Sequence, residues 1–210
     1  HAVYIREDEV KAYVKELARS YDTAYRKHAF TTAEGKDITI DSGFYGWRMN
    51  RSEETEELIN LIKQGTVVER EPVYIQTAAS HGERDYGDTY VEINLSKQHL
   101  YFWEKGNIII ESDFVSGNMV KGMATPGGIF PITYKERNAV LKGTNYRTPV
   151  SYWMPFNGGI GMHDAPWRKQ FGGTIYETNG SHGCINLPVD AAREIYEHVE
   201  AGMPVICYYE

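Results

Sequence analysis

One short window, residues 161–188, gathers the side chains of this chain that are best suited to nucleophilic catalysis. Cys184 follows three small or polar residues, Ser-His-Gly, that allow the backbone to turn sharply, and it precedes an apolar run that leads into a helical pattern. This position predicts a thiol at an exposed turn. Because a free thiol is ionised to only roughly a few per cent near neutral pH, the thiol would need a base or a cation nearby.

Two histidines could act as that base. His182 lies two positions before Cys184, and side chains at that spacing share a face when the backbone is extended. His163 lies upstream beyond a glycine-bearing loop and could approach the sulfur from a neighbouring strand. The commoner roles of such residues are core packing for a cysteine and a surface hydrogen bond for a histidine. A zinc site would need a fourth ligand, and only Asp164 could supply one, so we expect no metal and no cofactor.

The segments around these residues resemble the signature of the L,D-transpeptidases, the YkuD-type enzymes that cross-link peptidoglycan. The matching segments are HDAPW at 163–167 and SHGCINL at 181–187. Upstream, ATPGGIFPI at 124–132 and NYRT at 145–148 are similar to further family segments. The resemblance covers about residues 86–210.

The resemblance implies acyl transfer through a thioester. Cys184 would attack a tetrapeptide stem of peptidoglycan, D-Ala would leave, and an amine of a neighbouring stem would resolve the acyl-enzyme into a 3→3 cross-link. His163 would take the thiol proton. Ser181 would orient the imidazole through its main-chain carbonyl, and the N–H groups of Gly183 and Cys184 would stabilise the oxyanion.

The resemblance also suggests residues that bind substrate. Tyr146 and Trp167 match positions that line the donor pocket, although both could equally belong to the core. His182 could position the donor, tune the thiol or pack. Asn186 stands where many members have arginine, which leaves open what that position binds.

Three alternative functions remain. An L,D-carboxypeptidase would share these residues and use water as the acceptor. A cysteine endopeptidase usually has its cysteine before its histidine, opposite to the order here. A catalytically silent wall-binding module would not be acylated by a carbapenem β-lactam, whereas the family resemblance implies that such a β-lactam inhibits the enzyme.

Composition limits the classes of partner and the cellular setting that the chain of 210 residues can have. Its net charge of -7 and pI near 5.5 argue against a nucleic-acid partner. No apolar run is long enough to span a membrane, and no signal peptide is evident. Because peptidoglycan lies outside the cytoplasm, the resemblance implies an extracytoplasmic enzyme, anchored to the membrane or wall by a segment outside this sequence. Cys207 lies in an apolar C-terminal run and is predicted to be core.

The first 85 residues predict a small α+β domain. Apolar residues at three- and four-residue steps predict a helix over 7–28. A second helix would be capped by Asn50 with Glu53, or by Ser52 alone, and ended by Gly65. This arrangement resembles the peptidoglycan-binding module that precedes the catalytic domain in the family, although a spacer would have the same pattern. Small and polar residues at 78–87 predict the boundary.

Residues 86–210 predict a mainly β catalytic domain, a YkuD-like mixed sheet or sandwich with one main helix. Period-two patterns and turn signals predict strands near 90–95, 99–103 and 108–110, with short strands around His163. After Pro188, apolar residues on one face predict the helix, and Gly202 would end it.

Overall fold

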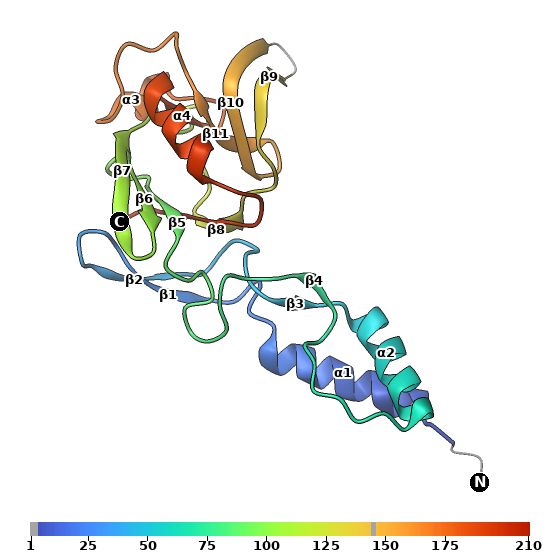
Figure 1. Ribbon diagram of the computed structural model, residues 1–210. Helices are drawn as coiled ribbons and strands as arrows, with labels where there is room; N and C mark the ends of the chain where they lie inside the picture. Colours follow the sequence, from blue (N-terminus) through green and yellow to red (C-terminus); the bar gives the residue numbers. More distant parts are fainter. Residues whose placement is uncertain (1–3, 144–145) are drawn as a thin grey trace. The chain divides into compact units, whose positions relative to one another are not determined.

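The computed structural model describes residues 4–143 and 146–210, so Asn145 of the family-like NYRT segment lies outside the described residues. The chain forms two compact units that are each discontinuous in sequence (Figure 1). The smaller unit contains the residues up to Ala24 together with Gly46–Ala78, and the larger contains Tyr25–Tyr45 together with Ala79–Glu210. The predicted division at 85/86 differs from these units because residues 25–45 and 79–85 belong with the larger one.

Two helices and a short sheet make up the smaller unit. They are α1 (Glu7–Tyr21), α2 (Arg51–Gln64), β3 (Arg48–Met49) and β4 (Tyr74–Gln76), and β3 pairs antiparallel with β4. Val14 and Ala18 of α1 are buried against Met49, with Leu17 and Leu58 packed around them. The unit therefore has a small apolar core of its own.

Local sequence signals predicted the ends of α2 correctly but not the end of α1. Asn50 caps α2 by accepting a hydrogen bond from the N–H of Glu53, and Gly65 ends it in the left-handed conformation with φ 64°, as predicted. The predicted extent of α1 to residue 28 was wrong. The helix ends at Tyr21 because Asp22 is extended and its carboxylate accepts a hydrogen bond from the N–H of Met49, at 2.8 Å.

Two sheets form the larger unit. One has the strand order β7-β6-β5-β13-β8 and the other has the order β12-β11-β10-β9. The strands of the first are β5 (Tyr90–Asn94), β6 (His99–Glu104), β7 (Asn107–Asp113), β8 (Gly128–Pro131) and β13 (Pro204–Tyr208); those of the second are β9 (Glu136–Lys142), β10 (Arg147–Asn157), β11 (Ile160–Asp164) and β12 (Ile185–Leu187). Both sheets are mixed, since β13 pairs parallel with β5 and β12 pairs parallel with β11. This confirms the predicted mainly β fold.

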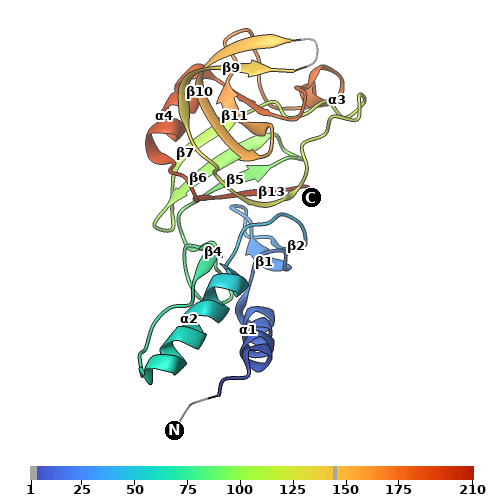
Figure 2. The ribbon, with the colours of Figure 1, turned by 90° about the vertical axis from the view of Figure 1, so that its right-hand side faces the viewer.

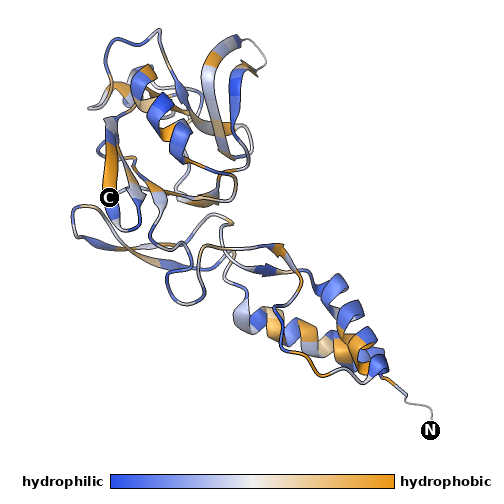
Figure 3. Cartoon of the chain, in the orientation of Figure 1, coloured by the Kyte–Doolittle hydropathy of each residue, from blue (hydrophilic) through white to orange (hydrophobic). Residues whose placement is uncertain are grey.

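One apolar core joins the two sheets and a helix. Buried side chains of both sheets form a single cluster with those of α4 (Val189–His198), among them Phe102, Met154, Ile185 and Ile195. In Figure 2, α4 lies along one side of the two sheets, and Figure 3 shows hydrophilic and hydrophobic stretches alternating along it. α4 is the predicted main helix. The short helix α3 (Ile175–Asn179) was not predicted.

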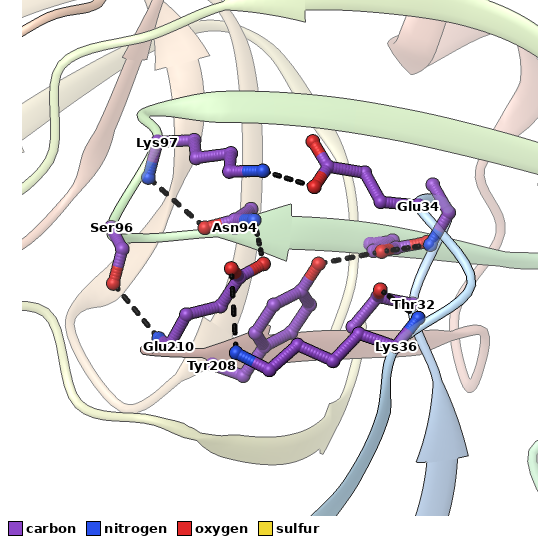
Figure 4. A network of polar contacts seen from close by, with 10 residues as sticks. Thr32, Glu34, Lys36, Asn94, Ser96, Lys97, Tyr208 and Glu210 are labelled. Atoms are coloured by element: carbon purple, nitrogen blue, oxygen red, sulfur yellow. Dashed lines mark hydrogen bonds and ion pairs between the residues drawn. The ribbon is translucent and has the colours of Figure 1, made fainter.

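The hairpin of β1 (His28–Thr31) and β2 (Asp37–Ile40) belongs to the larger unit, where its turn contacts β5 and Phe30 of β1 packs on Tyr208 of β13. The buried Glu92 accepts hydrogen bonds from the N–H of Ala33 at 2.8 Å and from the hydroxyl of Tyr208 at 2.7 Å. In Figure 4, Lys97 forms an ion pair with Glu34 of the hairpin. Sequence patterns alone did not indicate that this hairpin packs on a sheet so far along the chain.

Cys207 is fully buried in β13, as predicted. Within residues 4–143 and 146–210, no helix has the length and apolar character needed to cross a membrane.

Candidate active site

Parallel pairing of β11 with β12 brings the predicted catalytic side chains together. His163 of β11 is in register with Asn186 of β12. Cys184 lies immediately before β12 and two residues before Asn186, so alternation along the extended chain places both side chains on the same face. His163, Cys184 and Asn186 all line one pocket of about 220 Å³.

The imidazole of His163 is buried and held at both nitrogens. Its Nδ1 is 2.8 Å from the carbonyl oxygen of Asp164, which can only accept, so Nδ1 carries the proton. Its Nε2 therefore accepts a hydrogen bond from Nδ2 of Asn186, at 3.1 Å. Burial lowers the pKa of His163, which favours this neutral form. The rings of Trp153 and Trp167 both lie 6.0 Å from the imidazole centroid.

The expected role of the Ser181 carbonyl was wrong, because that oxygen accepts a hydrogen bond from the N–H of Asn118 at 2.9 Å. The carbonyl that holds the imidazole belongs to Asp164. The side chain of Ser181 instead closes the turn that carries the cysteine. Its hydroxyl donates to the carbonyl of Cys184 at 2.5 Å and accepts from the N–H of Gly183 at 3.0 Å.

A buried threonine supports the same turn from a second side. The hydroxyl of Thr125, in the family-like segment 124–132, donates to the carbonyl of Gly183 at 2.6 Å and accepts from the N–H of Gly117 at 3.0 Å. Gly183 has φ 124°, a conformation that side-chain-bearing residues rarely adopt. The glycine is therefore required by the backbone of the turn itself, in addition to any need for space near the substrate.

The twisted backbone at Gly183 also redirects His182. The alternation that would place His182 beside the sulfur requires extended backbone between them, and Gly183 breaks it. The His182 ring is exposed and stacks on Tyr146 instead, with centroids 4.8 Å apart and planes 22° apart. Both residues, with Trp167, line the pocket around Cys184.

The thiol of Cys184 lies in an apolar setting. Its Sγ is 3.6 Å from the carbonyl oxygen of Gly159, to which it can donate, and the residue packs against the cluster that contains Trp153. Burial raises the pKa of Cys184 to about 11, although a hydrogen bond from the backbone of Gly161 acts in the opposite direction. Together with the lowered pKa of His163, this predicts that the resting pair is an uncharged thiol and an uncharged imidazole.

Arg168 is a site residue that the sequence analysis missed. Its Nε–H donates to Oδ1 of Asn186 at 2.8 Å, and Nη1 donates to the carbonyl of Asn179 at 2.9 Å. Arg168 is partly buried and lines the pocket together with Cys184. Its position five residues after His163 was the available signal, but only the fold shows that it contacts Asn186. The site thus answers what Asn186 binds: a histidine on one side and an arginine on the other.

Asp164, considered above as a zinc ligand, has a structural role. Its Oδ1 accepts hydrogen bonds from the N–H groups of Ser151 and Tyr152, both at 2.8 Å. Among the residues that the structure describes, no group of three or more histidine, cysteine, aspartate or glutamate side chains is arranged to hold a metal ion.

Comparison with known families defines the class of protein. Residues 88–207 match the YkuD family, described as the L,D-transpeptidase catalytic domain, and residues 1–68 match the family described as "Putative peptidoglycan binding domain". The chain therefore belongs to the L,D-transpeptidase family, as the sequence segments indicated, and the family is one of enzymes.

Known relatives are similar over different parts of the chain. A crystal structure of a cysteine-to-serine mutant of Enterococcus faecium L,D-transpeptidase is 35% identical, with a TM-score of 0.81, covering 99% of this chain and 84% of that one. The E. faecium catalytic domain acylated by ertapenem is 42% identical with a TM-score of 0.53, covering 58% of this chain and 98% of that one. L,D-transpeptidase 2 of Mycobacterium tuberculosis is 25% identical over 185 residues, 78% of this chain. The chain spans only 43% of that relative.

Proposed function

We propose that this protein is a peptidoglycan L,D-transpeptidase that forms 3→3 cross-links through a thioester on Cys184. The observation that carries the proposal is the common face of Cys184, His163 and Asn186, which places a thiol and a neutral imidazole in one pocket. A nucleophile with an adjacent base is the arrangement that covalent acyl transfer requires.

The first half of the reaction acylates the cysteine. The thiol leaves its contact with the Gly159 carbonyl, and its proton passes to Nε2 of His163 as the Asn186 amide gives up that nitrogen. The sulfur then attacks the carbonyl carbon between the third residue of the donor stem and its terminal D-Ala. The bond from that carbon to nitrogen breaks, and the imidazolium returns the proton to the departing amine.

The second half transfers the acyl group. An amine of a neighbouring stem attacks the thioester carbon and loses a proton to Nε2 of His163, and the sulfur leaves and recovers that proton. The neutral resting pair suits this scheme, because the base must accept a proton twice in each cycle. A histidine with a lowered pKa is neutral at neutral pH, so its Nε2 carries no proton and can accept one.

The oxyanion of each tetrahedral intermediate needs preorganised N–H donors. The N–H of Gly183 already donates to the hydroxyl of Ser181, at 3.0 Å, so it can stabilise the oxyanion only by sharing its proton between the two acceptors. We therefore propose the N–H of Cys184 as the principal donor among the two that the sequence suggested. Gly183 acts mainly by giving the turn its shape.

The walls of the pocket suit a peptide donor. Tyr146 and Trp167, with 39% and 51% of their surface exposed, offer aromatic faces in the pocket that contains Cys184 and His163. His182 supports Tyr146 by stacking on it, and this is the role we propose for it. Because an E. faecium relative has been acylated by ertapenem, we also propose that carbapenems acylate Cys184.

The remaining proposals concern the setting of the reaction. Peptidoglycan lies outside the cytoplasmic membrane, so we propose that the enzyme acts there, tethered by a segment outside this sequence. The smaller unit would hold the enzyme on the wall, as the match of residues 1–68 suggests.

The test is mass spectrometry of the products and the intact protein after incubation with a disaccharide-tetrapeptide. A product with the mass of two joined disaccharide-tetrapeptides less one D-Ala, which does not form with Cys184→Ala, supports the proposal. The matched control is Cys207→Ala, which removes the other cysteine, in the core, and should leave dimer formation intact. Loss of D-Ala without a dimer would replace the proposal by an L,D-carboxypeptidase, and retained dimer formation in Cys184→Ala would refute the mechanism.

A further inference from the structure

A directional chain of hydrogen bonds ends on the imidazole. Arg168 donates through Nε to Oδ1 of Asn186, Asn186 donates through Nδ2 to Nε2 of His163, and His163 donates through Nδ1 to the carbonyl of Asp164. Each donor has a definite partner, so reversing one link would break the next. Arginine has only donors, and a backbone carbonyl only accepts, so both ends of the chain fix its direction.

The side-chain amide of Asn186 could present either its oxygen or its nitrogen to His163. An oxygen would require a proton on Nε2, and because Nδ1 already carries one, the ring would then be a cation. A nitrogen requires a lone pair on Nε2 and hence a neutral ring. Arg168 selects the second orientation because it occupies the amide oxygen at 2.8 Å.

We propose that Arg168 is a positioning residue that holds His163, through Asn186, in the neutral form whose lone pair is on Nε2. Arg168 does not touch the sulfur in this arrangement. Its relevance to catalysis depends on the proposed function, but its effect on the imidazole does not.

The charges around His163 act in opposite directions. Burial is the largest influence and lowers the pKa of His163. The hydrogen bond to the Asp164 backbone and the Asp164 carboxylate raise that pKa, and the positive charge of Arg168 lowers it. Tyr146, His182 and Cys184 are the other titratable groups that line the same pocket. Removal of Arg168 would therefore remove both an orienting hydrogen bond and a repulsive charge, and both changes favour the imidazolium.

The experiment is an NMR titration of the imidazole nitrogens in the full chain, with the His163 signals assigned from their loss in His163→Gln. In the parent protein we expect a neutral ring protonated on Nδ1 across neutral pH. Arg168→Met should raise the pKa of His163, because the variant lacks both the donor to Asn186 and the positive charge. Arg168→Gln retains a donor for Asn186 without the charge, so it should keep the Nδ1–H tautomer and shift the pKa less.

Lys169→Met is the matched control because Lys169 is the neighbouring exposed cation and does not line the pocket with Cys184. It should leave the titration of His163 unchanged. If Arg168→Met does not fold, Asn186→Asp provides the second test: a carboxylate offers only oxygens to Nε2 and should raise the pKa of His163. The proposal is overturned if these variants leave the pKa and tautomer unchanged, or if Lys169→Met shifts them equally.

Activity provides a separate readout. If the inference is correct and the protein is a transpeptidase, the acidic limb of its pH-rate profile should move to higher pH in Arg168→Met. An NMR shift in a protein that forms no thioester would leave this inference standing and refute the proposed function. A protein that forms cross-links, but in which Arg168→Met leaves the NMR titration of His163 unchanged, would support the proposed function and refute this inference.

Discussion

The resting state of the thiol can be tested by the pH dependence of its alkylation. Burial raises the pKa of Cys184 to about 11, two units above its ordinary value of 9.0. This shift corresponds to about 3 kcal/mol favouring the thiol over the thiolate, and it lowers the thiolate fraction at pH 7 about 100-fold. A thiolate of higher pKa is more nucleophilic, which recovers roughly tenfold. We therefore expect Cys184 to react with iodoacetamide about tenfold more slowly than an unperturbed cysteine at pH 7.

The assay follows carbamidomethylation of the Cys184 peptide by mass spectrometry between pH 5 and pH 10. The rate should rise about tenfold for each pH unit up to pH 10, without a plateau. Because the assay reads the Cys184 peptide, the buried Cys207 does not contribute to the measured rate.

A different profile would refute this reasoning. A thiolate–imidazolium pair would give a rate that is already high and level between pH 6 and pH 8, and that falls in His163→Ala. If that plateau is seen, the neutral resting pair is wrong and His163 carries the proton before the substrate arrives. The expected result is that His163→Ala leaves the alkylation profile nearly unchanged while it abolishes turnover of a peptide stem.

Four further changes test the supports of the site and fold. Thr125→Val removes two buried hydrogen bonds from the turn and should cost about 2–3 kcal/mol in denaturant unfolding, whereas a loss below about 0.5 kcal/mol would mean that the turn holds without it. Gly183→Ala forces a side chain onto φ 124° and should cost about 1–3 kcal/mol; an unchanged melting temperature would contradict the strain. Glu92→Ala removes the carboxylate that accepts hydrogen bonds from Ala33 and Tyr208, so amide hydrogen exchange in residues 28–40 should become faster. Unchanged protection of these amides would show that the hairpin does not depend on Glu92 for its attachment to the sheet. Because the pKa of His163 is lowered in the folded state, the unfolded state binds a proton at higher pH than the folded state does. The free energy of unfolding should therefore decline as pH falls below 6.5. His163→Gln should lessen that decline, and an identical pH dependence in the variant would exclude this linkage.

The sequence predicted which side chains meet in the pocket better than it predicted the residues that support them. Cys184, His163 and Asn186 are recognisable because a family signature surrounds them, and parallel pairing of β11 with β12 brings them to one pocket. The carbonyl that orients His163 was assigned wrongly, since any backbone carbonyl is equally available in a sequence. Only the fold shows that the Ser181 carbonyl is engaged by Asn118 and that the Asp164 carbonyl faces the imidazole.

The fold was predictable where its signals are local. The cap at Asn50 and the stop at Gly65 are properties of a few neighbouring residues, and both are present in the structure. The end of α1 was missed because it depends on the contact between Asp22 and the backbone of Met49, far along the chain. The placement of the β1–β2 hairpin was missed for the same reason, since its acceptor, Glu92, lies in a strand that follows α2 and β4.

The thiol of Cys184 and the imidazole of His163 have separate supports, which bears on how the site tolerates change. The sulfur is placed by a turn whose carbonyl and N–H groups bind the hydroxyls of Thr125 and Ser181. The imidazole is placed by Asp164 and by the chain that begins at Arg168. These supports share no side chain, so a change in the turn should move the sulfur without altering the tautomer of the imidazole. Residues that do not contact each other usually have additive effects. Additive losses of activity from Thr125→Val and Arg168→Met would therefore follow from this separation.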